Sequence, residues 1–371
     1  MQYEMLYIRK EELPMATKLQ SYFPMIRTRM EVLEEIRSKP GLSATFRKWE
    51  EGQQKEFVDF CTGVRGVKLL YDSFFKEIIN PESTPERLEE FLTQLLGQAV
   101  KIHGVLPNDS ARIADEGSLL ILDILVELED GSLANVEAQK VGYKFPGERC
   151  ACYSADLLLR QYKRVRSDKK DKFSYKDIKQ VYTIVLFERS PKAFHDFPSV
   201  YRHRMKQKSD TGIEIPLLQE YVFVPLDIFR KNLQNRGIEN DLDAWLAFLS
   251  VDEPEMIIRL IEKYPRFQPM YEQVYEMCRN IERVMGLYSE ELRIMDRNTV
   301  QLMIDELQGQ IDEQKGQIDA QKEQIDVQKE RIDIQKERID EQKEQLDQKN
   351  SVIDEQAREI AELKRRLEEK K

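Results

Sequence analysis

Two acidic residues, Asp123 and Glu137, stand inside apolar segments on either side of the turn sequence EDGS, residues 129–132. Burying an unpaired carboxylate costs several kcal/mol, roughly, unless a cation or a donor satisfies it. If this turn joins two antiparallel strands, side-chain alternation lets Asp123 and Glu137 approach each other across the hairpin. Carboxylates this close favour a divalent cation, and Mg²⁺ also accepts a backbone carbonyl such as that of Ala138. The pair therefore predicts a metal centre that activates water and stabilises charge on a phosphate.

The alternative is a solvated hairpin face, on which acidic residues are common. Glu127 and Glu129 fit that explanation. Asp123 fits it less well, because its neighbours on both sides are aliphatic.

The surrounding elements indicate how these acids are positioned. From residue 119 the hydrophobic period changes from helical to alternating, which predicts strands over 118–128 and 132–141. Helical spacing follows over 149–166, then an apolar strand over 180–187 and a further strand candidate ended by Pro225. Residues before about 66 and from about 240 read as helical, with Pro40 and Gly41 breaking the first region. This order predicts an α/β fold with a mixed sheet.

The stretches DSFFKEI (72–78), LDI around Asp123, VEAQ (136–139), GERCACYSADLLLRQY (147–162) and YTIVLF (182–187) resemble the PD-(D/E)XK nuclease family transposases. These relatives of the recombination-promoting nucleases are matched over roughly residues 70–250. Each motif is weak alone, and their order and spacing together are fairly specific.

The resemblance implies a restriction-endonuclease-like αβββαβ core that cleaves DNA phosphodiesters with Mg²⁺ or Mn²⁺. Asp123 and Glu137 are then the metal ligands, and Gln139 occupies the place where the superfamily usually has a lysine. A glutamine carries no charge, so it orients water only through hydrogen bonds. Lys140 alternates to the opposite face unless a bulge redirects it. Asp72 is a candidate third metal ligand, and an ordinary solvent-facing helix residue is the equal alternative.

A basic stretch follows the predicted site. We expect phosphate contacts without base reading from Arg149, Lys163, Arg164, Arg166, Lys169 and Lys170. Gln161 is an auxiliary candidate, and it and Arg149 either contact the phosphate backbone or tie helix to sheet. No aromatic stacking motif or base-reading element is recognisable, so DNA and RNA are not separated.

The C-terminal region repeats every seven residues. Isoleucine or leucine recurs from Ile304 to Leu367, while the companion positions are mostly glutamine. A seven-residue apolar repeat favours a left-handed coiled coil, here a weak one, and therefore a homo-oligomer. A solitary charged helix held by pairs such as Asp312 with Lys315 is the alternative. The predicted domains are a helical region 1–66, a nuclease-like core 67–235, a helical region 236–300 and a coiled coil 301–371.

Composition restricts the remaining classes. The 371 residues carry a formal net charge of -10, so any polyanion must bind at a local patch. The four cysteines show no CxxC pairing, and no apolar run reaches the ~20 residues that a bilayer requires. We therefore expect a cytoplasmic protein without a membrane segment. The three histidines have neither ligand spacing nor a nucleophile partner, which argues against a histidine-based hydrolase.

Two functions remain. The first is a metal-dependent endonuclease (a phosphodiesterase) associated with mobile elements or recombination, that is, a transposase. The second is a catalytically weak or inactive nuclease-fold scaffold that binds DNA or protein and assembles through its tail. The acidic pair favours the first, whereas Gln139 and the net acidity favour the second.

Overall fold

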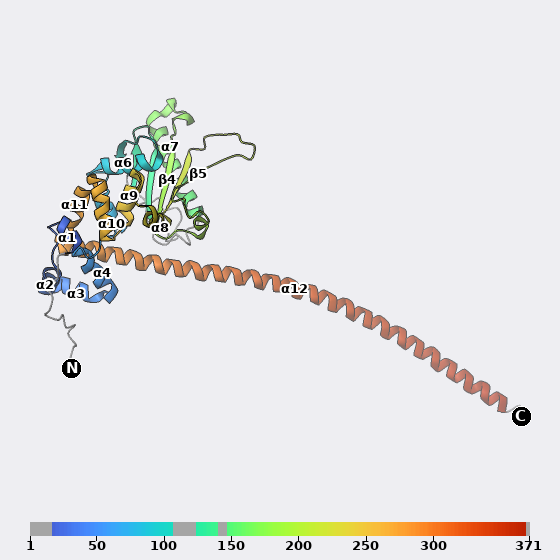
Figure 1. Cartoon of the computed structure of the whole chain (residues 1–371). Helices are drawn as coiled ribbons and strands as arrows, with labels where there is room; N and C mark the ends of the chain where they lie inside the picture. The colour runs from blue at the N-terminus through green and yellow to red at the C-terminus, as the bar shows by residue number, and fades with distance from the viewer. Residues whose placement is uncertain (1–16, 107–123, 140–146, 369–371) are drawn as a thin grey trace, which may run out of the picture. The chain divides into compact units, whose positions relative to one another are not determined.

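The computed structural model describes residues 17–106, 124–139 and 147–368 and divides the chain into two compact units, Met1–Arg293 and Ile294–Lys371. In the first unit, a mixed six-stranded sheet has the order β1-β2-β3-β4-β6-β5. Figure 1 labels β4 and β5 of this sheet. Its strands are β1 Ile102–Val105, β2 Ile124–Leu128, β3 Leu133–Gln139, β4 Val181–Phe187, β5 His203–Lys206 and β6 Gln219–Pro225. The predicted α/β restriction-endonuclease-like class is confirmed.

Strand β3 lies inside the sheet. It pairs antiparallel with β2, from Ile124 opposite Val136 to Glu127 opposite Leu133. On its other side it pairs in parallel with β4, from Leu133 beside Val181 to Gln139 beside Phe187. The predicted hairpin turn is present: Gly131 adopts φ +84°, which favours glycine, and its N–H donates to the Leu128 carbonyl at 2.9 Å.

Helices cover both faces of the sheet. Helix α7 (Gly147–Lys169) packs Tyr153 and Leu157 against Leu125, Leu133 and Val181 on one face. The other face presents Ala134, Val136 and Ile184 to the main hydrophobic core. That core includes buried residues of α5 (Asp72–Ile78), α6 (Pro85–Leu96), α8 (Leu226–Arg236), α9 (Asp241–Ser250), α10 (Pro254–Lys263) and α11 (Gln268–Arg279).

Strands β1 and β5 were not predicted, because each has only four residues, too few to show a hydrophobic pattern in sequence. The first predicted strand began at residue 118, whereas β2 begins at Ile124 and residues 107–123 lie outside the described ranges. Short 3₁₀ turns lie at Lys170–Lys172, Tyr175–Asp177, Lys192–Asp196 and Pro265–Phe267.

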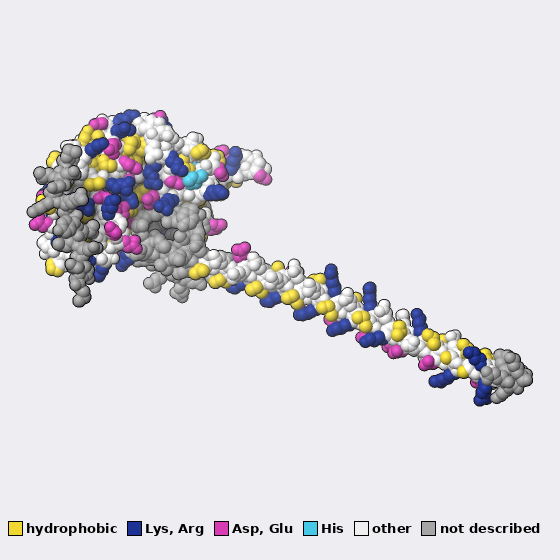
Figure 2. Space-filling view, turned by 60° about the horizontal axis from the view of Figure 1, so that its bottom comes forward, with side chains coloured by type: hydrophobic (Ala, Val, Ile, Leu, Met, Phe, Trp, Pro, Cys, Tyr) yellow, Lys and Arg dark blue, Asp and Glu magenta, His cyan; other side chains and the backbone are white. Residues whose placement is uncertain are grey.

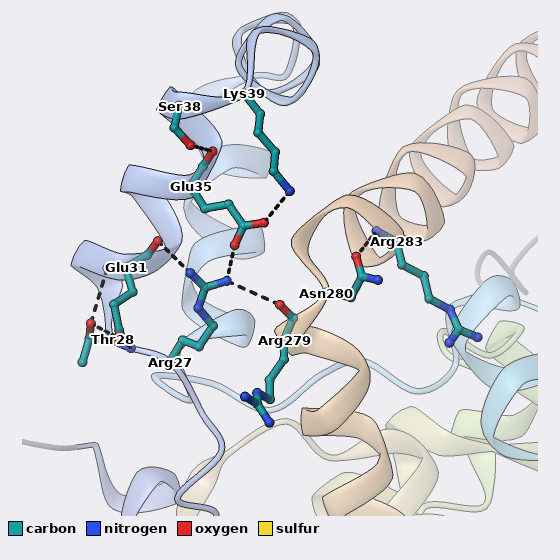
Figure 3. Close-up of polar contacts among 9 residues, drawn as sticks. All are labelled: Arg27, Thr28, Glu31, Glu35, Ser38, Lys39, Arg279, Asn280 and Arg283. Atoms are coloured by element: carbon teal, nitrogen blue, oxygen red, sulfur yellow. Dashed lines mark hydrogen bonds and ion pairs between the residues drawn. The ribbon is translucent and has the colours of Figure 1, made fainter.

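The N-terminal helices are α1 Lys18–Tyr22, α2 Arg29–Ser38, α3 Pro40–Lys48 and α4 Glu51–Cys61. Pro40 is the first residue of α3, a position where its missing N–H costs nothing. Around α2, Thr28 and Glu31 form a capping box, and Arg27 pairs with Glu35 (Figure 3). Arg27 also donates to the Arg279 carbonyl at 3.4 Å, which ties the start of α2 to the end of α11.

Helix α12 runs from Ile281 to Glu368, 88 residues, and spans both units. In the second unit the repeating isoleucines Ile311, Ile318, Ile325, Ile332 and Ile339 are 45–51% exposed, and Figure 2 shows hydrophobic side chains along this helix. Lysine and aspartate three residues apart form exposed pairs, as between Lys329 and Asp326 at 3.3 Å. Within the described ranges, no helix combines the length and apolar character that crossing a bilayer requires.

One polar network joins the N-terminal helices, the start of α5 and α12. The Glu56 carboxylate accepts hydrogen bonds from the hydroxyls of Tyr71 at 2.9 Å and Tyr288 at 2.8 Å, and it pairs with Lys68 at 2.5 Å. Burial raises the pKa of Glu56, but the Lys68 pair and the two tyrosine hydroxyls outweigh burial and leave that pKa below its ordinary value of 4.5. The network therefore fixes Tyr71, the residue immediately before α5.

Replacing Glu56 by Gln tests this network. We expect the free energy of unfolding at pH 7 to fall by about 1–2 kcal/mol, a value discounted for partial exposure. Because folding lowers the Glu56 pKa, this contribution is present above pH 4.5 and is lost as pH falls through the folded value. Denaturant unfolding at pH 7 and near pH 3 should therefore show the difference between wild type and Glu56→Gln shrinking in acid.

Glu34→Gln is the matched control, since Glu34 is an exposed residue of α2. Its stability should follow wild type at both pH values. An equal loss in Glu34→Gln and Glu56→Gln would mean that the Glu56 network contributes nothing specific.

Candidate active site

Glu137 and Gln139 lie on the α7 side of β3. Alternation places Leu133, Asn135, Glu137 and Gln139 on one face of the strand, and Leu133 packs against α7. Glu137 is only 4% exposed, whereas Gln139 is half-buried. The Gln139 carbonyl accepts from the Glu188 N–H at 2.9 Å, just after β4. This end of β3 therefore holds a buried carboxylate and an accessible amide two residues apart.

Two further polar side chains lie on the same face, and the sequence analysis assigned neither of them a role. Asn135 is beside Thr183 in the parallel register of β3 and β4, and both are 0% exposed. Within the described ranges, the Asn135 amide and the Thr183 hydroxyl have no hydrogen-bond partner. Buried polar groups are normally hydrogen-bonded, so such a pair beside Glu137 marks this strand face as unusual. Thr183 gave no signal in sequence, because it stands alone in an apolar strand.

Several predicted site residues lie beyond what the structure describes. Asp123 and Lys140 fall outside the described ranges. Asp72 is the first residue of α5 and Arg149 is in the first turn of α7, but their side chains are not among those described.

The start of α5 lies at the same end of the sheet as Gln139. Tyr71, the residue before α5, and Glu188, which contacts Gln139, line one cavity of about 240 Å³. Three cationic side chains line it as well, Arg65, Lys68 and Arg230. Each has an internal partner, and Glu188, Asp252 and Glu253 balance their charge. The cavity is therefore not an anion site by charge alone, but it places Asp72 and Gln139 at one end of the sheet.

The basic stretch lies at the opposite end. Gln161 donates to the Gly131 carbonyl at 3.0 Å and accepts from the Lys179 N–H at 2.7 Å, so this part of α7 is beside the start of β3. Gln139 is six residues further along β3, ~20 Å away at strand rise. Gln161 therefore ties helix to sheet, and Lys163, Arg164, Arg166, Lys169 and Lys170 are not brought together with Glu137.

Two of these basic residues already have acidic partners. Arg164 makes a bidentate pair with Glu127 at 2.6 and 2.7 Å, and Lys169 contacts Asp177 at 2.6 Å. Arg166 lies over the Tyr162 ring, 5.6 Å from its centroid. Lys163 and Lys170 are exposed.

A serine, a histidine and an aspartate meet after β4, contrary to the expectation that the histidines lack a nucleophile partner. Ser190, His195 and Asp227 contact one another at 3.2 Å. Both contacts of the imidazole use Nε2, whereas a catalytic triad joins serine and aspartate to different ring nitrogens. This cluster therefore lacks the geometry for nucleophilic catalysis.

No group of three or more His, Cys, Asp or Glu side chains is placed to hold a metal ion in the part of the chain that the structure describes. The Glu137 face nevertheless presents several side-chain oxygen atoms. They belong to the carboxylate of Glu137, the amide of Asn135 and the hydroxyl of Thr183. Oxygen donors of this kind suit a hard cation such as Mg²⁺ or Mn²⁺.

Comparison of the sequence with known proteins gives a match to a protein-family model. The family model described as PD-(D/E)XK nuclease family transposase matches residues 69–303, which include the whole sheet and the start of α12. The searches of curated proteins and of solved structures returned no match. Because the family model covers more than half of the sequence, the chain belongs to the PD-(D/E)XK nuclease family transposases.

Proposed function

We propose that this protein is a metal-dependent DNA endonuclease associated with mobile elements or recombination, in which Asp123 and Glu137 bind Mg²⁺ or Mn²⁺. The observation that supports it best is the burial of the Glu137 carboxylate on the same strand face as Gln139. Gln139, two residues further along, is half-buried, so a carboxylate and an accessible amide lie together at this end of an inner strand. Family membership supports a nuclease or transposase-like function in general.

The hairpin register supports Asp123 as the second ligand. Described pairing ends with Ile124 opposite Val136. In the sequence Asp123 precedes Ile124 and Glu137 follows Val136, so one more step of this antiparallel register would pair the two acids. Asp72 is proposed as a third ligand, because α5 begins at the Gln139 end of the sheet.

The remaining residues have supporting roles in this proposal. A bound divalent cation would supply charge stabilisation at the phosphate and a nucleophile at neutral pH. Gln139 donates and accepts hydrogen bonds and thereby orients the attacking water, without acting as a base. Asn135 and Thr183 offer further hydrogen-bonding atoms on the same strand face, which water or a bound ion would use.

Phosphate contacts are proposed at two places. Arg149 begins α7 near the Gln139 end, and Lys163, Arg166 and Lys170 are exposed at the other. Arg164 and Lys169 contribute less, because each is paired with an acid. A cytoplasmic location accompanies this proposal, and the four cysteines, which form no disulfide in the described part of the chain, agree with a reducing compartment.

The second unit is proposed to form a homo-oligomeric coiled coil. The repeating isoleucines are about half-exposed in one chain and would be buried against another. Two cores held in this way place two active sites on one DNA, which a cut through both strands requires.

The metal proposal predicts parallel losses in two variants. Mg²⁺ or Mn²⁺ should raise the melting temperature of wild type, because a ligand that binds only the folded state stabilises it. Asp123→Asn and Glu137→Gln should each abolish that rise and reduce plasmid cleavage at least ~100-fold. Thermal denaturation with and without the cation, followed by cleavage on the same samples, measures both.

Glu129→Gln is the matched control, since Glu129 is an exposed acid at the hairpin turn. It should keep the metal-induced rise and the cleavage rate. Cleavage by wild type that persists in EDTA, or a full metal response in Glu137→Gln, would contradict the proposed centre.

Gln139 is predicted to affect turnover without affecting metal binding. Gln139→Leu removes the hydrogen bonds that orient water, and its cleavage rate should fall ~10- to 100-fold. The metal-induced rise in melting temperature should stay at the wild-type value, since Gln139 is not a proposed ligand. Loss of both properties together would instead assign Gln139 to the metal centre itself.

Removal of residues 310–371 tests the tail. We expect a folded core that is monomeric by light scattering and whose double-strand cutting falls more than its nicking. Ile325→Asn combined with Ile332→Asn should act in the same direction, whereas Lys322→Gln with Lys329→Gln, on exposed charges of the same helix, should not. A monomeric full-length protein at micromolar concentration would disprove the oligomer.

A further inference from the structure

Three aromatic rings gather on the surface where α7 ends. Tyr162 stacks on Tyr175 with centroids 6.1 Å apart and an interplanar angle of 11°, and Phe173 meets Tyr175 edge-on at 5.4 Å. Tyr175 is 73% exposed, although a ring of this size is usually buried at least in part. We call Tyr162, Phe173 and Tyr175 the aromatic platform. The sequence analysis found no stacking motif, because these rings come together only when the chain reverses after α7.

The platform is held in place by polar contacts. Ser174 and Asp177 cap each other's backbone, with the Ser174 N–H donating to the Asp177 carboxylate at 2.8 Å. Lys169 contacts the same carboxylate at 2.6 Å, which joins the last turn of α7 to the turn that carries Tyr175. The Arg166 guanidinium lies over the other large ring of the stack, Tyr162. These contacts therefore hold the three rings in a fixed arrangement on the surface.

The charge around the platform is strongly positive. Residues 162–179 contain eight Lys or Arg and three Asp, an excess of five positive charges, in a chain of net charge -10. All six lysines of this range are exposed, namely Lys163, Lys169, Lys170, Lys172, Lys176 and Lys179, and Lys169 is paired with Asp177. Exposed rings beside exposed cations match the two features of an unpaired nucleic-acid strand, its base faces and its phosphates.

We propose that the aromatic platform binds an unpaired segment of a nucleic-acid strand, with a base stacked on Tyr175 and adjacent phosphates on the surrounding lysines. A paired duplex offers its phosphates but not its base faces, so the ring serves only single-stranded or frayed regions. This inference goes beyond the proposed cleavage, because the platform lies at the end of the sheet opposite Gln139. It concerns the form of nucleic acid that the protein holds.

The test measures binding of the full-length protein in EDTA, which separates binding from metal-dependent cleavage. Fluorescence anisotropy with labelled oligothymidylate and with a labelled duplex gives the two affinities. Tyr175→Leu should weaken single-strand binding about five-fold or more and change duplex binding less than two-fold, whereas Tyr175→Phe, which keeps the ring, should bind as wild type.

Two controls define the contributions of ring and charge. Tyr22→Leu replaces another exposed tyrosine, one that contacts Glu262, and should leave both affinities unchanged. Combining Lys170→Gln, Lys172→Gln and Lys176→Gln should lower the salt dependence of single-strand binding by about 0.7 in slope per lost phosphate contact, whereas Tyr175→Leu keeps the wild-type slope. Circular dichroism checks that every variant is folded.

Three results would overturn the inference. They are a Tyr175→Leu protein that binds single strands within two-fold of wild type, equal losses on single strand and duplex, and no single-strand binding by wild type at low salt. If the lysine variants weaken binding while Tyr175→Leu does not, the surface is electrostatic only and the stacking role is wrong. Unchanged cleavage and an unchanged metal response in Glu137→Gln would contradict the metal proposal and leave this one standing, because single-strand binding is measured in EDTA.

Discussion

The position of β3 inside the sheet is the constraint on which the rest of the site depends. Hydrogen bonds to β2 on one side and β4 on the other fix its register, so each of its side chains has a set direction. One face is apolar and joins the main core through Ala134 and Val136. Along the other face the side chains change from Leu133, under α7, to Asn135, Glu137 and Gln139. A shift of one residue would exchange these faces and bury the polar set in the core.

Helix α7 separates two regions of the first unit. Tyr153 and Leu157 in its middle are apolar and close the sheet face. Its first turn follows the Gln139 end of β3, whereas its last turns, fixed by Gln161 and by the Arg164 pair with Glu127, lie beside the start of that strand. The basic residues at the end of α7 follow the candidate site closely in sequence. In the structure, however, the length of α7 separates them from Glu137 and Gln139.

The sequence was sufficient wherever local pattern determines structure. The Asp130-Gly131 turn predicted the β2–β3 hairpin, and the apolar run over 180–187 predicted the buried β4. Strands β1 and β5 escaped prediction because their pairing with β2 and β6, rather than their own composition, makes them strands. Thr183, the Glu56 network and the aromatic platform were not predicted for a different reason. Each depends on residues that tertiary packing brings together, and a single sequence does not show such contacts.

Two buried carboxylates elsewhere in the first unit show how the fold satisfies acidic side chains that have a structural role. Asp243, 0% exposed, accepts hydrogen bonds from the Tyr201 hydroxyl at 2.6 Å and from the Glu239 N–H at 3.0 Å, and it pairs with Arg236. Glu220, 2% exposed, pairs with Arg204 and with Lys206. In both cases local cations and donors satisfy the carboxylate. Within the described ranges, Asn135 and Thr183 have no such partners.

This contrast bears on function because an unsatisfied buried polar group costs about 1–3 kcal/mol and does nothing for folding. In the part of the chain that the structure describes, the main core also buries the polar atoms of Trp245, Tyr271 and Tyr275 without a partner, but Asn135 and Thr183 lie side by side on the strand face that carries the buried carboxylate of Glu137. Water or a bound ion can use the hydrogen-bonding capacity of this pair, whereas an apolar pair at these positions would stabilise the sheet more. The stability of the sheet therefore does not account for the polar face of β3, which agrees with the metal site proposed there.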